Sequence, residues 1–429
     1  MAKQEAIAAV DPYAEGPAVA RGTSRGRRFR ALVIDGTSSA VEELTVIDLP
    51  RNDVVVRTEA VHVSYTMANW ARRGLGLESH SGVVEWPLIP PFVLGHYAVG
   101  IVEAIGEDVR RTRPGDRVIV AGTPVCGVCY ACNQGRQDRC QFMTTQPHAI
   151  AARADGTPVS NSLAIGGMAE LTIAAEEFVI PVFTDLPAIE LAMIAGTPGM
   201  GLGAALTMAP VEPGSNVAIF GCGPLGLGAV QGARLRGASQ IIAIEPVRRR
   251  REAAIAMGAT IALDPAAEED LIERVRNLCE SPNRRYYAGG RAAVDMPAFR
   301  GADFTIEAVG GELFPPRVEP SPDPTGILPI QQALEVTCAT GHVSYTGIAQ
   351  RGEVSFVPWH ITNSSRTMRG LQMGGIQALK DYPRYVALAE KGLIDLSAMA
   401  THVCRLDDFH EAFEHVAYRT TLASVIDFS

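Results

Sequence analysis

The sequence lacks an apolar run of the roughly 18 residues that a membrane-spanning helix needs. Its first residues, "MAKQEAIAAVDPYAEG", have too short an apolar core for a secretory signal. The 38 Lys and Arg residues are outnumbered by 47 Asp and Glu residues, and the formal net charge of −9 argues against binding nucleic acid through charge. We therefore expect a cytoplasmic protein that has neither membrane nor nucleic-acid partners.

Cysteine is also scarce, because 8 cysteines in 429 residues are too few for a disulfide scaffold. Four of them are clustered in "CGVCYACNQGRQDRC", with the spacing C-x₂-C-x₂-C-x₇-C: Cys126, Cys129, Cys132 and Cys140. Four thiolates in so short a loop suit a closed, structural Zn²⁺ site, so we predict a zinc lobe over residues 124–142. A redox pair and an iron–sulfur cluster are the alternatives.

The chain is long enough for two or three domains. Residues 1–28 contain few apolar side chains and are expected to form a flexible, solvated arm, with a partner-binding arm as the alternative. Over residues 29–196, short β-rich runs alternate with Gly and Pro turns, as in "DVVVRTEAVHVS" and "AVGIVEAIG". This alternation predicts a compact, mostly antiparallel, barrel-like domain.

The pattern changes over residues 197–370, where strand-like runs such as "NVAIFG", "IIAIEP" and "ADFTIEAVG" alternate with helical spacing. Alternating strands and helices predict an α/β domain built on a doubly wound parallel sheet. Two Pro-, Gly- and Arg-rich stretches, 281–301 and 314–329, are read as long inserted loops. Residues 371–429 are expected to add amphipathic helices and a closing strand, "ASVIDF".

A glycine loop marks the start of this α/β domain. In "NVAIFGCGPLGLGAV" the motif G-x-G-x-x-G follows a strand and opens a helix, and an acidic residue stands 24 positions after the first glycine, at the end of the next strand. That context is the dinucleotide-binding fingerprint. The acidic residue favours NAD over NADP, although the arginines of "RRRR" (248–251) could meet a 2′-phosphate. We assign these residues to cofactor binding: Gly221, Gly223, Pro224, Leu225, Gly226, Glu245, Arg250, Gly347 and Ile348.

The glycine loop, the four-cysteine lobe and "PGDRV" (114–118), in this order, resemble the medium-chain dehydrogenase/reductase superfamily, in its zinc alcohol dehydrogenase branch. The resemblance runs from about residue 28 to the C-terminus. It implies a GroES-like catalytic domain, split between the N-terminal half and the C-terminal tail, around a Rossmann domain. It further implies an active-site cleft between the two domains, a small-molecule substrate and a homodimer or homotetramer.

The resemblance breaks at the family's catalytic zinc. The first family ligand is a cysteine in a stretch like Gly-Val-Cys-His-Thr-Asp, which here reads "HVSYTM" with Ser64 at the ligand position. The histidine of Gly-His-Glu is retained as His96, but Tyr97 replaces the glutamate, and Gly196 stands at the second cysteine ligand. A serine hydroxyl and one imidazole do not hold Zn²⁺ tightly, so we expect one structural Zn²⁺ per chain and no catalytic Zn²⁺. His96 is then a remnant or a hydrogen-bonding pocket residue.

Other family positions have changed as well. The arginines that meet the cofactor pyrophosphate correspond to Tyr65 and about Ala423. The hydroxyl that hands on the substrate proton is retained as Thr66, whereas the distal histidine of that relay corresponds to Asn69. Candidate groups for an oxygen that develops negative charge are therefore Thr66, Tyr97, His96, Tyr65 and Ser64. Tyr97 could equally be a packing aromatic.

Four classes of function follow. The first is NAD(H)-dependent hydride transfer without catalytic zinc, acting on an activated alkene or on a ketone/alcohol pair. Met67, Trp70, Met200 and Leu202 suggest an apolar substrate, and are equally consistent with ordinary core. The other classes are a nicotinoprotein or lyase/isomerase that retains NAD, a conventional zinc alcohol dehydrogenase, and a catalytically inactive binding protein.

Overall fold

The computed structural model describes residues 24–36, 38–73, 90–144, 148–209, 211–279, 299–349 and 352–429. Most of the predicted N-terminal arm and most of the insert predicted at 281–301 lie outside these residues. The backbone N–H of Gly26 donates to the carbonyl of Val46, and Arg28 already belongs to the first strand. The described structure thus begins at residue 24, within the segment 1–28 that was predicted to be an arm.

The N-terminal half contains a small closed barrel, in the strand order β1-β2-β7-β8-β4. Its strands are β1 (Arg28–Asp35), β2 (Ser38–Val46), β7 (Ala149–Ala152), β8 (Pro158–Asn161) and β4 (Phe92–Val93). Buried side chains from β1, such as Phe29 and Val33, pack inside it with Leu44 and Ile150. Successive side chains of β1 point to opposite faces, so Leu32 and Ile34 belong to a second core cluster on the other face of this strand.

A second sheet joins the two ends of the chain. In the described residues its order is β10-β6-β5-β3-β18-β17, with β9 also paired to β3. The last strand, β18, runs antiparallel to β3 and aligns Ser424 with Val63. The C-terminal segment therefore completes the N-terminal sheet. These strands are β3 (Asp53–Val63), β5 (Ala98–Ile105), β6 (Arg117–Val120), β9 (Leu171–Ala175), β10 (Val179–Pro181), β17 (Ala400–Cys404) and β18 (Ala423–Asp427).

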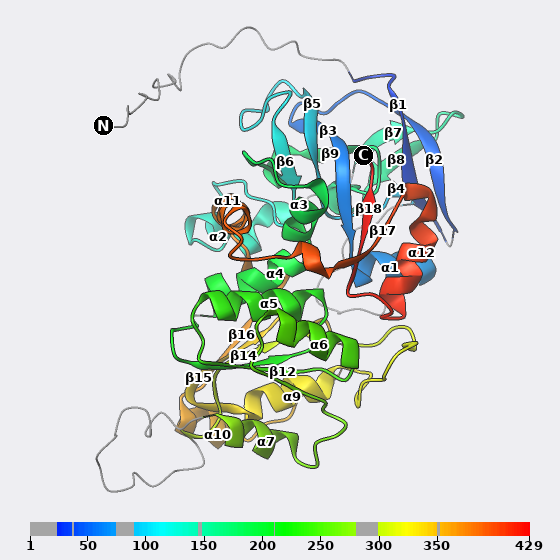
Figure 1. The fold of residues 1–429 in the computed structure, drawn as a ribbon. Helices are drawn as coiled ribbons and strands as arrows, with labels where there is room; N and C mark the ends of the chain where they lie inside the picture. The colour runs from blue at the N-terminus through cyan, green and yellow to red at the C-terminus, as the bar shows by residue number, and fades with distance from the viewer. Residues whose placement is uncertain are drawn as a thin grey trace, which may run out of the picture.

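The middle of the chain forms a parallel sheet in the order β13-β12-β11-β14-β15-β16. This is the 3-2-1-4-5-6 order of a doubly wound dinucleotide-binding fold. Helices cover it, and it lies below the β-rich part in Figure 1. The strands are β11 (Asn216–Phe220), β12 (Gln240–Ile244), β13 (Ile261–Leu263), β14 (Ala302–Glu307), β15 (Thr337–Tyr345) and β16 (Thr367–Gly370).

The expected helices are present between strands of the parallel sheet and within residues 371–429, and one predicted loop is partly helical. Helix α9 begins at Ile327, so the insert predicted over 314–329 ends earlier than expected. Helices α3 and α4 lie between the two halves of the molecule (Figure 1). The helices are α1 (Tyr65–Arg73), α2 (Tyr130–Asn133), α3 (Ala188–Ala195), α4 (Thr197–Gly203), α5 (Pro224–Leu235), α6 (Arg248–Met257), α7 (Leu271–Leu278), α9 (Ile327–Glu335), α10 (Pro358–Ser364), α11 (Ala378–Glu390) and α12 (Phe409–Ala417).

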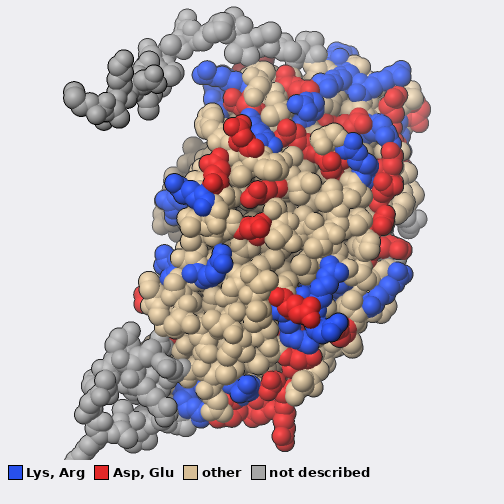
Figure 2. Space-filling view, in the orientation of Figure 1, with Lys and Arg blue, Asp and Glu red and all other residues tan. Residues whose placement is uncertain are grey.

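Within the described part of the chain, no one helix has both the length and the apolar character to cross a bilayer. The bent pair Ala188–Ala195 and Thr197–Met208 meets that criterion only when its two helices are counted together. On the face shown in Figure 2, basic and acidic side chains are interspersed over the β-rich part, and a broad uncharged area covers the middle.

Candidate active site

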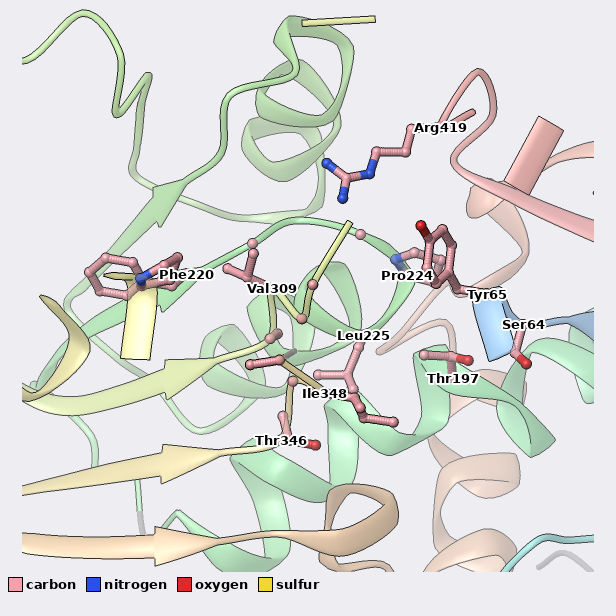
Figure 3. Close-up of a pocket in the computed structure, with 18 of the residues that line it drawn as sticks. Ser64, Tyr65, Thr197, Phe220, Pro224, Leu225, Val309, Thr346, Ile348 and Arg419 are labelled. Atoms are coloured by element: carbon pink, nitrogen blue, oxygen red, sulfur yellow. The ribbon is translucent and has the colours of Figure 1, made fainter. Parts of the chain in front are cut away.

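A single pocket of about 1130 Å³ lies between the β-rich part and the parallel sheet. Its lining includes all five side chains predicted to be catalytic and every predicted cofactor residue except Gly226. Of the four apolar residues expected at the substrate, Trp70 and Met200 line it, whereas Met67 and Leu202 are fully buried in the core. Figure 3 shows Ser64, Tyr65 and Thr197 on one side of this space and the glycine loop beside them.

The glycine loop joins β11 to helix α5 in the geometry that a dinucleotide requires. Gly221 has a φ of +82°, a left-handed conformation that favours glycine. A Cβ on Gly226 would lie 1.8 Å from the carbonyl oxygen of Gly221, so the helix approaches the strand closely only with glycine there. Gly223 precedes α5, and Pro224 stands in the first turn of that helix. The unpaired N–H groups of this helix end can receive a pyrophosphate.

Two charged residues follow the glycine loop. Glu245 is buried, and its two carboxylate oxygens accept backbone N–H groups from Cys222 at 2.7 Å and from Val247 at 3.0 Å. Arg250 extends from α6 toward the loop, with Nη1 3.9 Å from where a Cβ on Gly223 would be. Its Nε is buried without a partner, and burial lowers the pKa of its guanidinium. A partly buried guanidinium that lines the pocket beside a phosphate-binding loop offers a counter-charge to an anion.

Ser64 and His96, which the family resemblance aligns with two zinc ligands, are in contact with each other. Ser64 precedes α1, and its Oγ accepts the N–H of Met67 at 3.2 Å, which is the contact of a helix N-cap. The same Oγ lies 3.3 Å from His96 Nε2. His96 Nδ1 is buried without a partner. Burial, reinforced by the neighbouring His62, lowers the pKa of His96 to about 3, so this imidazole is neutral.

His62 is the pocket residue that the sequence prediction missed. It lies on β3, and both ring nitrogens are buried without a hydrogen-bond partner. A Cβ on Gly196 would lie 2.7 Å from His62 Nδ1, so the imidazole fills the space of a side chain at position 196. Burial lowers the pKa of His62 to about 3. The first letter of "HVSYTM" carries the signal, because the family stretch has glycine there and cysteine at the position of Gly196.

Tyr97 packs beside these imidazoles. Its ring centroid lies 4.2 Å from that of His96 and 6.3 Å from that of His62. Its hydroxyl points to the sulfur of Met200 at 3.8 Å. Burial raises the pKa of Tyr97, so the phenol keeps its proton.

Comparison with known proteins agrees with this architecture. The family model "Alcohol dehydrogenase GroES-like domain" matches residues 50–184, and the model "Zinc-binding dehydrogenase" matches residues 224–391. The chain belongs to the medium-chain alcohol dehydrogenase superfamily. The predicted fold class, a GroES-like domain together with a Rossmann domain, is thereby confirmed, and the protein is an oxidoreductase of the alcohol dehydrogenase type.

Individual relatives are distant. The S-(hydroxymethyl)glutathione dehydrogenase of Saccharomyces cerevisiae (strain ATCC 204508 / S288c) is 28% identical over 402 residues, covering 90% of this chain and 92% of its own. A zinc-binding-domain alcohol dehydrogenase protein from Burkholderia ambifaria has a TM-score of 0.79 at 23% identity, covering 94% of this chain and 99% of its own. The benzyl alcohol dehydrogenase of Acinetobacter calcoaceticus has a TM-score of 0.75 at 22% identity, covering 94% and 100%.

The residues beside His96 do not fit the family's catalytic zinc. A catalytic zinc takes three protein ligands drawn from imidazole, thiolate and carboxylate groups. Here Ser64 offers only a hydroxyl, and Gly196 has no side chain and no room for one. Among the residues that the structure describes, no cluster of three His, Cys, Asp or Glu ligands includes His62 or His96.

The four-cysteine lobe does fit a zinc ion. The four sulfur atoms converge to within 4.8 Å of one another. Backbone N–H groups of Gln141 and Cys132 lower the pKa of the Cys129 thiol to about 6, while burial raises the pKa of Cys140 to about 12. Four crowded sulfurs become thiolates together only when a cation compensates their charge, so this donor set suits a closed tetrahedral Zn²⁺ site.

The hydroxyl of Tyr65 is already engaged by the backbone of a loop rather than free to meet a substrate. Its hydroxyl accepts the backbone N–H of Leu313 at 2.8 Å and that of Phe314 at 3.3 Å. Its ring meets the Phe314 ring edge-on, with centroids 6.0 Å apart. These contacts tie α1 to residues 308–326, which we call the crossing loop because they run from β14 toward α9 along the pocket.

The C-terminal part of the chain holds the same loop. Arg419 donates to Glu312 Oε1 at 2.6 Å, and both side chains are largely buried. Farther along the loop, the Arg317 guanidinium lies 3.8 Å from the centre of the Tyr418 ring, and its backbone N–H donates to the carbonyl of Tyr418. Arg419 reaches over the glycine loop in Figure 3. The crossing loop, which starts from the parallel sheet, is therefore attached to the β-rich side of the pocket at α1 and again at the turn after α12.

Proposed function

We propose that this protein transfers hydride between NAD(H) and a small to medium apolar substrate without a catalytic zinc ion. The observation that carries the proposal is the pair of neutral, buried imidazoles of His62 and His96 at the family's metal position. Ring nitrogens on both residues have no partner. A neutral imidazole offers one N–H donor, so the pair can hydrogen-bond a substrate oxygen where related enzymes use a metal.

The protonation states at the site favour one class of acceptor. Tyr97 and both histidines are uncharged, so the site presents neutral donors rather than a cation. Such donors suit a transition state whose negative charge is spread over several atoms, as when hydride adds to the β-carbon of an enone or enoyl thioester. Thr66 and Tyr97 are our candidates for delivering the proton. We therefore favour an activated alkene over a ketone.

We also propose NAD as the dinucleotide, with NADP as the weaker ligand. When bound, the nicotinamide supplies or accepts the hydride. Glu245 offers carboxylate oxygens to ribose hydroxyls and repels a 2′-phosphate. Arg250 lies beside Gly223, where it can meet the pyrophosphate in place of the family arginines that are Tyr65 and Ala423 here.

The test is a steady-state assay of NADH oxidation against paired substrates, such as an enone and its saturated ketone. We expect faster turnover of the enone and no loss of rate when a chelator removes loosely bound metal. His62→Asn should lower kcat/KM by roughly 10²-fold, the order expected for a lost oxyanion donor. The control is His410→Asn, since His410 is exposed on α12. Zero turnover of every enone and ketone, or full inhibition by the chelator, would refute the proposal.

A second candidate, a nicotinoprotein that keeps its NAD between turnovers, is favoured by one observation. The crossing loop is fastened to the C-terminal part by Arg419 and Glu312, and to α1 by the hydroxyl of Tyr65. Exchange of a cofactor beneath it requires these contacts to open. In this second proposal Tyr65 holds the crossing loop against α1 and does not donate a proton to the substrate.

Cofactor retention is measured directly as the dissociation rate of NADH, followed by fluorescence after mixing with excess NAD. We expect the double variant Tyr65→Phe, Arg419→Gln to release NADH at least ten-fold faster than wild type. Arg405→Gln is a suitable control, because Arg405 pairs with Asp427 on the exposed sheet edge. Equal NADH release rates in the double variant and wild type would show that these contacts of the crossing loop do not retain the cofactor.

A further inference from the structure

A second group of potential metal ligands lies on the C-terminal part of the chain, outside the active site. His402 comes from β17, which is at one end of the strand order of its sheet, and Glu411 and His415 stand one turn apart on α12. Helix α12 packs against α1 at the right of Figure 1. None of the three residues takes part in the cofactor pocket.

The three side chains converge on one point. His402 Nε2 lies 3.5 Å from Glu411 Oε1, and His415 Nε2 lies 3.6 Å from the same oxygen. The two imidazole centroids are 4.4 Å apart. One donor atom from each of the three residues lies within 4.8 Å of the other two. Donors that bind Zn²⁺ tetrahedrally at about 2.0–2.1 Å are separated by about 3.3 Å, so small side-chain rotations would seat an ion.

The rings are also oriented for coordination. His415 Nδ1 lies 2.7 Å from Thr420 Oγ1, and an Nδ1–H donated to that hydroxyl leaves the Nε2 lone pair free for a cation. His402 Nδ1 is buried without a partner, so only its Nε2 faces the carboxylate. Glu411 is 63% exposed, which leaves room for water in the remaining coordination positions.

We propose that His402, Glu411 and His415 form a second metal site, which binds a borderline divalent transition-metal ion such as Zn²⁺. Two imidazoles and one carboxylate are the donors that such ions prefer, and the open position makes the site weaker than the four-cysteine lobe. The ion would link β17, through His402, to α12, through Glu411 and His415. It would also brace the turn after α12, where the backbone N–H of Thr420 donates to the carbonyl of His415 and Arg419 reaches toward Glu312.

The test is calorimetric titration of Zn²⁺ into the full-length protein with its four-cysteine site already filled. We expect one further ion per chain in the wild type, and binding at least ten-fold weaker in His402→Ala and in Glu411→Gln. The Glu411 variant guards against a folding artefact, because that side chain is mostly exposed. The matched control is His410→Ala, an exposed histidine on the same helix.

Thermal unfolding supplies a second readout. Added Zn²⁺ should raise the melting temperature of the wild type and of His410→Ala, because the ion binds only the folded chain, and should raise that of Glu411→Gln less at the same Zn²⁺ concentration. The same Zn²⁺ affinity in wild type, His402→Ala and Glu411→Gln would overturn the proposal and leave the three residues as a hydrogen-bonded triad.

Discussion

The imidazole ring of His62 occupies the space beside Gly196, where a Cβ would lie 2.7 Å from its Nδ1. In the alignment that the family resemblance implies, glycine stands at the position of His62 and a metal-binding cysteine at that of Gly196. In this alignment the larger side chain stands at position 62 here, instead of at position 196. The imidazole of His62 leaves no room for a side chain at position 196, so His62 and a cysteine ligand at that position exclude each other.

This mutual exclusion predicts how position 196 responds to substitution. Gly196→Ala should lower the free energy of unfolding by about 1–3 kcal/mol, because the new methyl group overpacks against His62. Adding His62→Gly should recover much of that loss. Urea denaturation of the single and double variants measures both values. An Ala at 196 that is tolerated without cost in the presence of His62 would contradict the prediction.

Restoring the family ligands should restore a metal site. The triple variant His62→Gly, Ser64→Cys, Gly196→Cys supplies two thiolates beside His96 and should bind one more tightly held Zn²⁺ per chain than wild type. Ser64→Cys alone should bind none, because one thiolate and one imidazole are too few ligands. Metal counting by mass spectrometry after dialysis decides between these outcomes, and extra tightly bound zinc in the single variant would be the contrary result.

The buried histidines should make stability depend on pH. Burial lowers the pKa of His62 and of His96 to about 3 in the folded chain, against an ordinary value of 6.5. Between these values the unfolded chain binds a proton that the folded chain does not. Each histidine therefore makes the free energy of unfolding rise with pH by up to about 1.4 kcal/mol per unit, until pH passes 6.5.

Urea denaturation at pH 5 and pH 6.5 tests this dependence. The gain in stability between these pH values should be smaller in His62→Gln than in wild type, since one titrating group is gone. An unchanged gain would show that His62 is charged in the folded protein or is exposed to solvent.

The four-cysteine lobe should depend on its metal. Cys129→Ser removes one thiolate, so the chain should lose its tightly bound zinc and several kcal/mol of stability. Cys404→Ser is the control, because Cys404 lies outside the lobe. Zinc content and melting temperature are the measurements, and a Cys129→Ser protein with wild-type zinc would exclude a four-thiolate site.

Cofactor preference should follow Glu245. Glu245→Ala should weaken NADH more than NADPH, because the carboxylate binds ribose hydroxyls and repels a phosphate. Glu252→Ala on the exposed face of α6 provides the control. Dissociation constants for NADH and NADPH check the prediction. An unchanged ratio of the two constants in Glu245→Ala would show that Glu245 does not select the cofactor.

Much of this fold could be predicted from local sequence signals. The glycine loop, the strand periodicity and the cysteine spacing each report on a short segment, and each segment has the expected form. Only the family resemblance implied that the C-terminal tail joins the N-terminal half. The pairing of β18 with β3 was not predicted, since partners far apart in the chain leave no local signature.

The site was harder to predict, because its decisive contacts join distant segments. His62 was overlooked because its importance depends on the missing side chain at Gly196. Tyr65 was read as a catalytic candidate, yet its hydroxyl accepts N–H groups from residues almost 250 positions away, at Leu313 and Phe314. The partnership of Arg419 with Glu312 likewise arises only when the crossing loop folds back.

The most direct test of zinc-free hydride transfer is anomalous X-ray diffraction at the zinc edge, from a crystal that oxidises NADH. The account predicts a zinc peak among Cys126, Cys129, Cys132 and Cys140, and none within bonding distance of His96 Nε2. A zinc peak beside the imidazoles of His62 and His96 in such a crystal would contradict it.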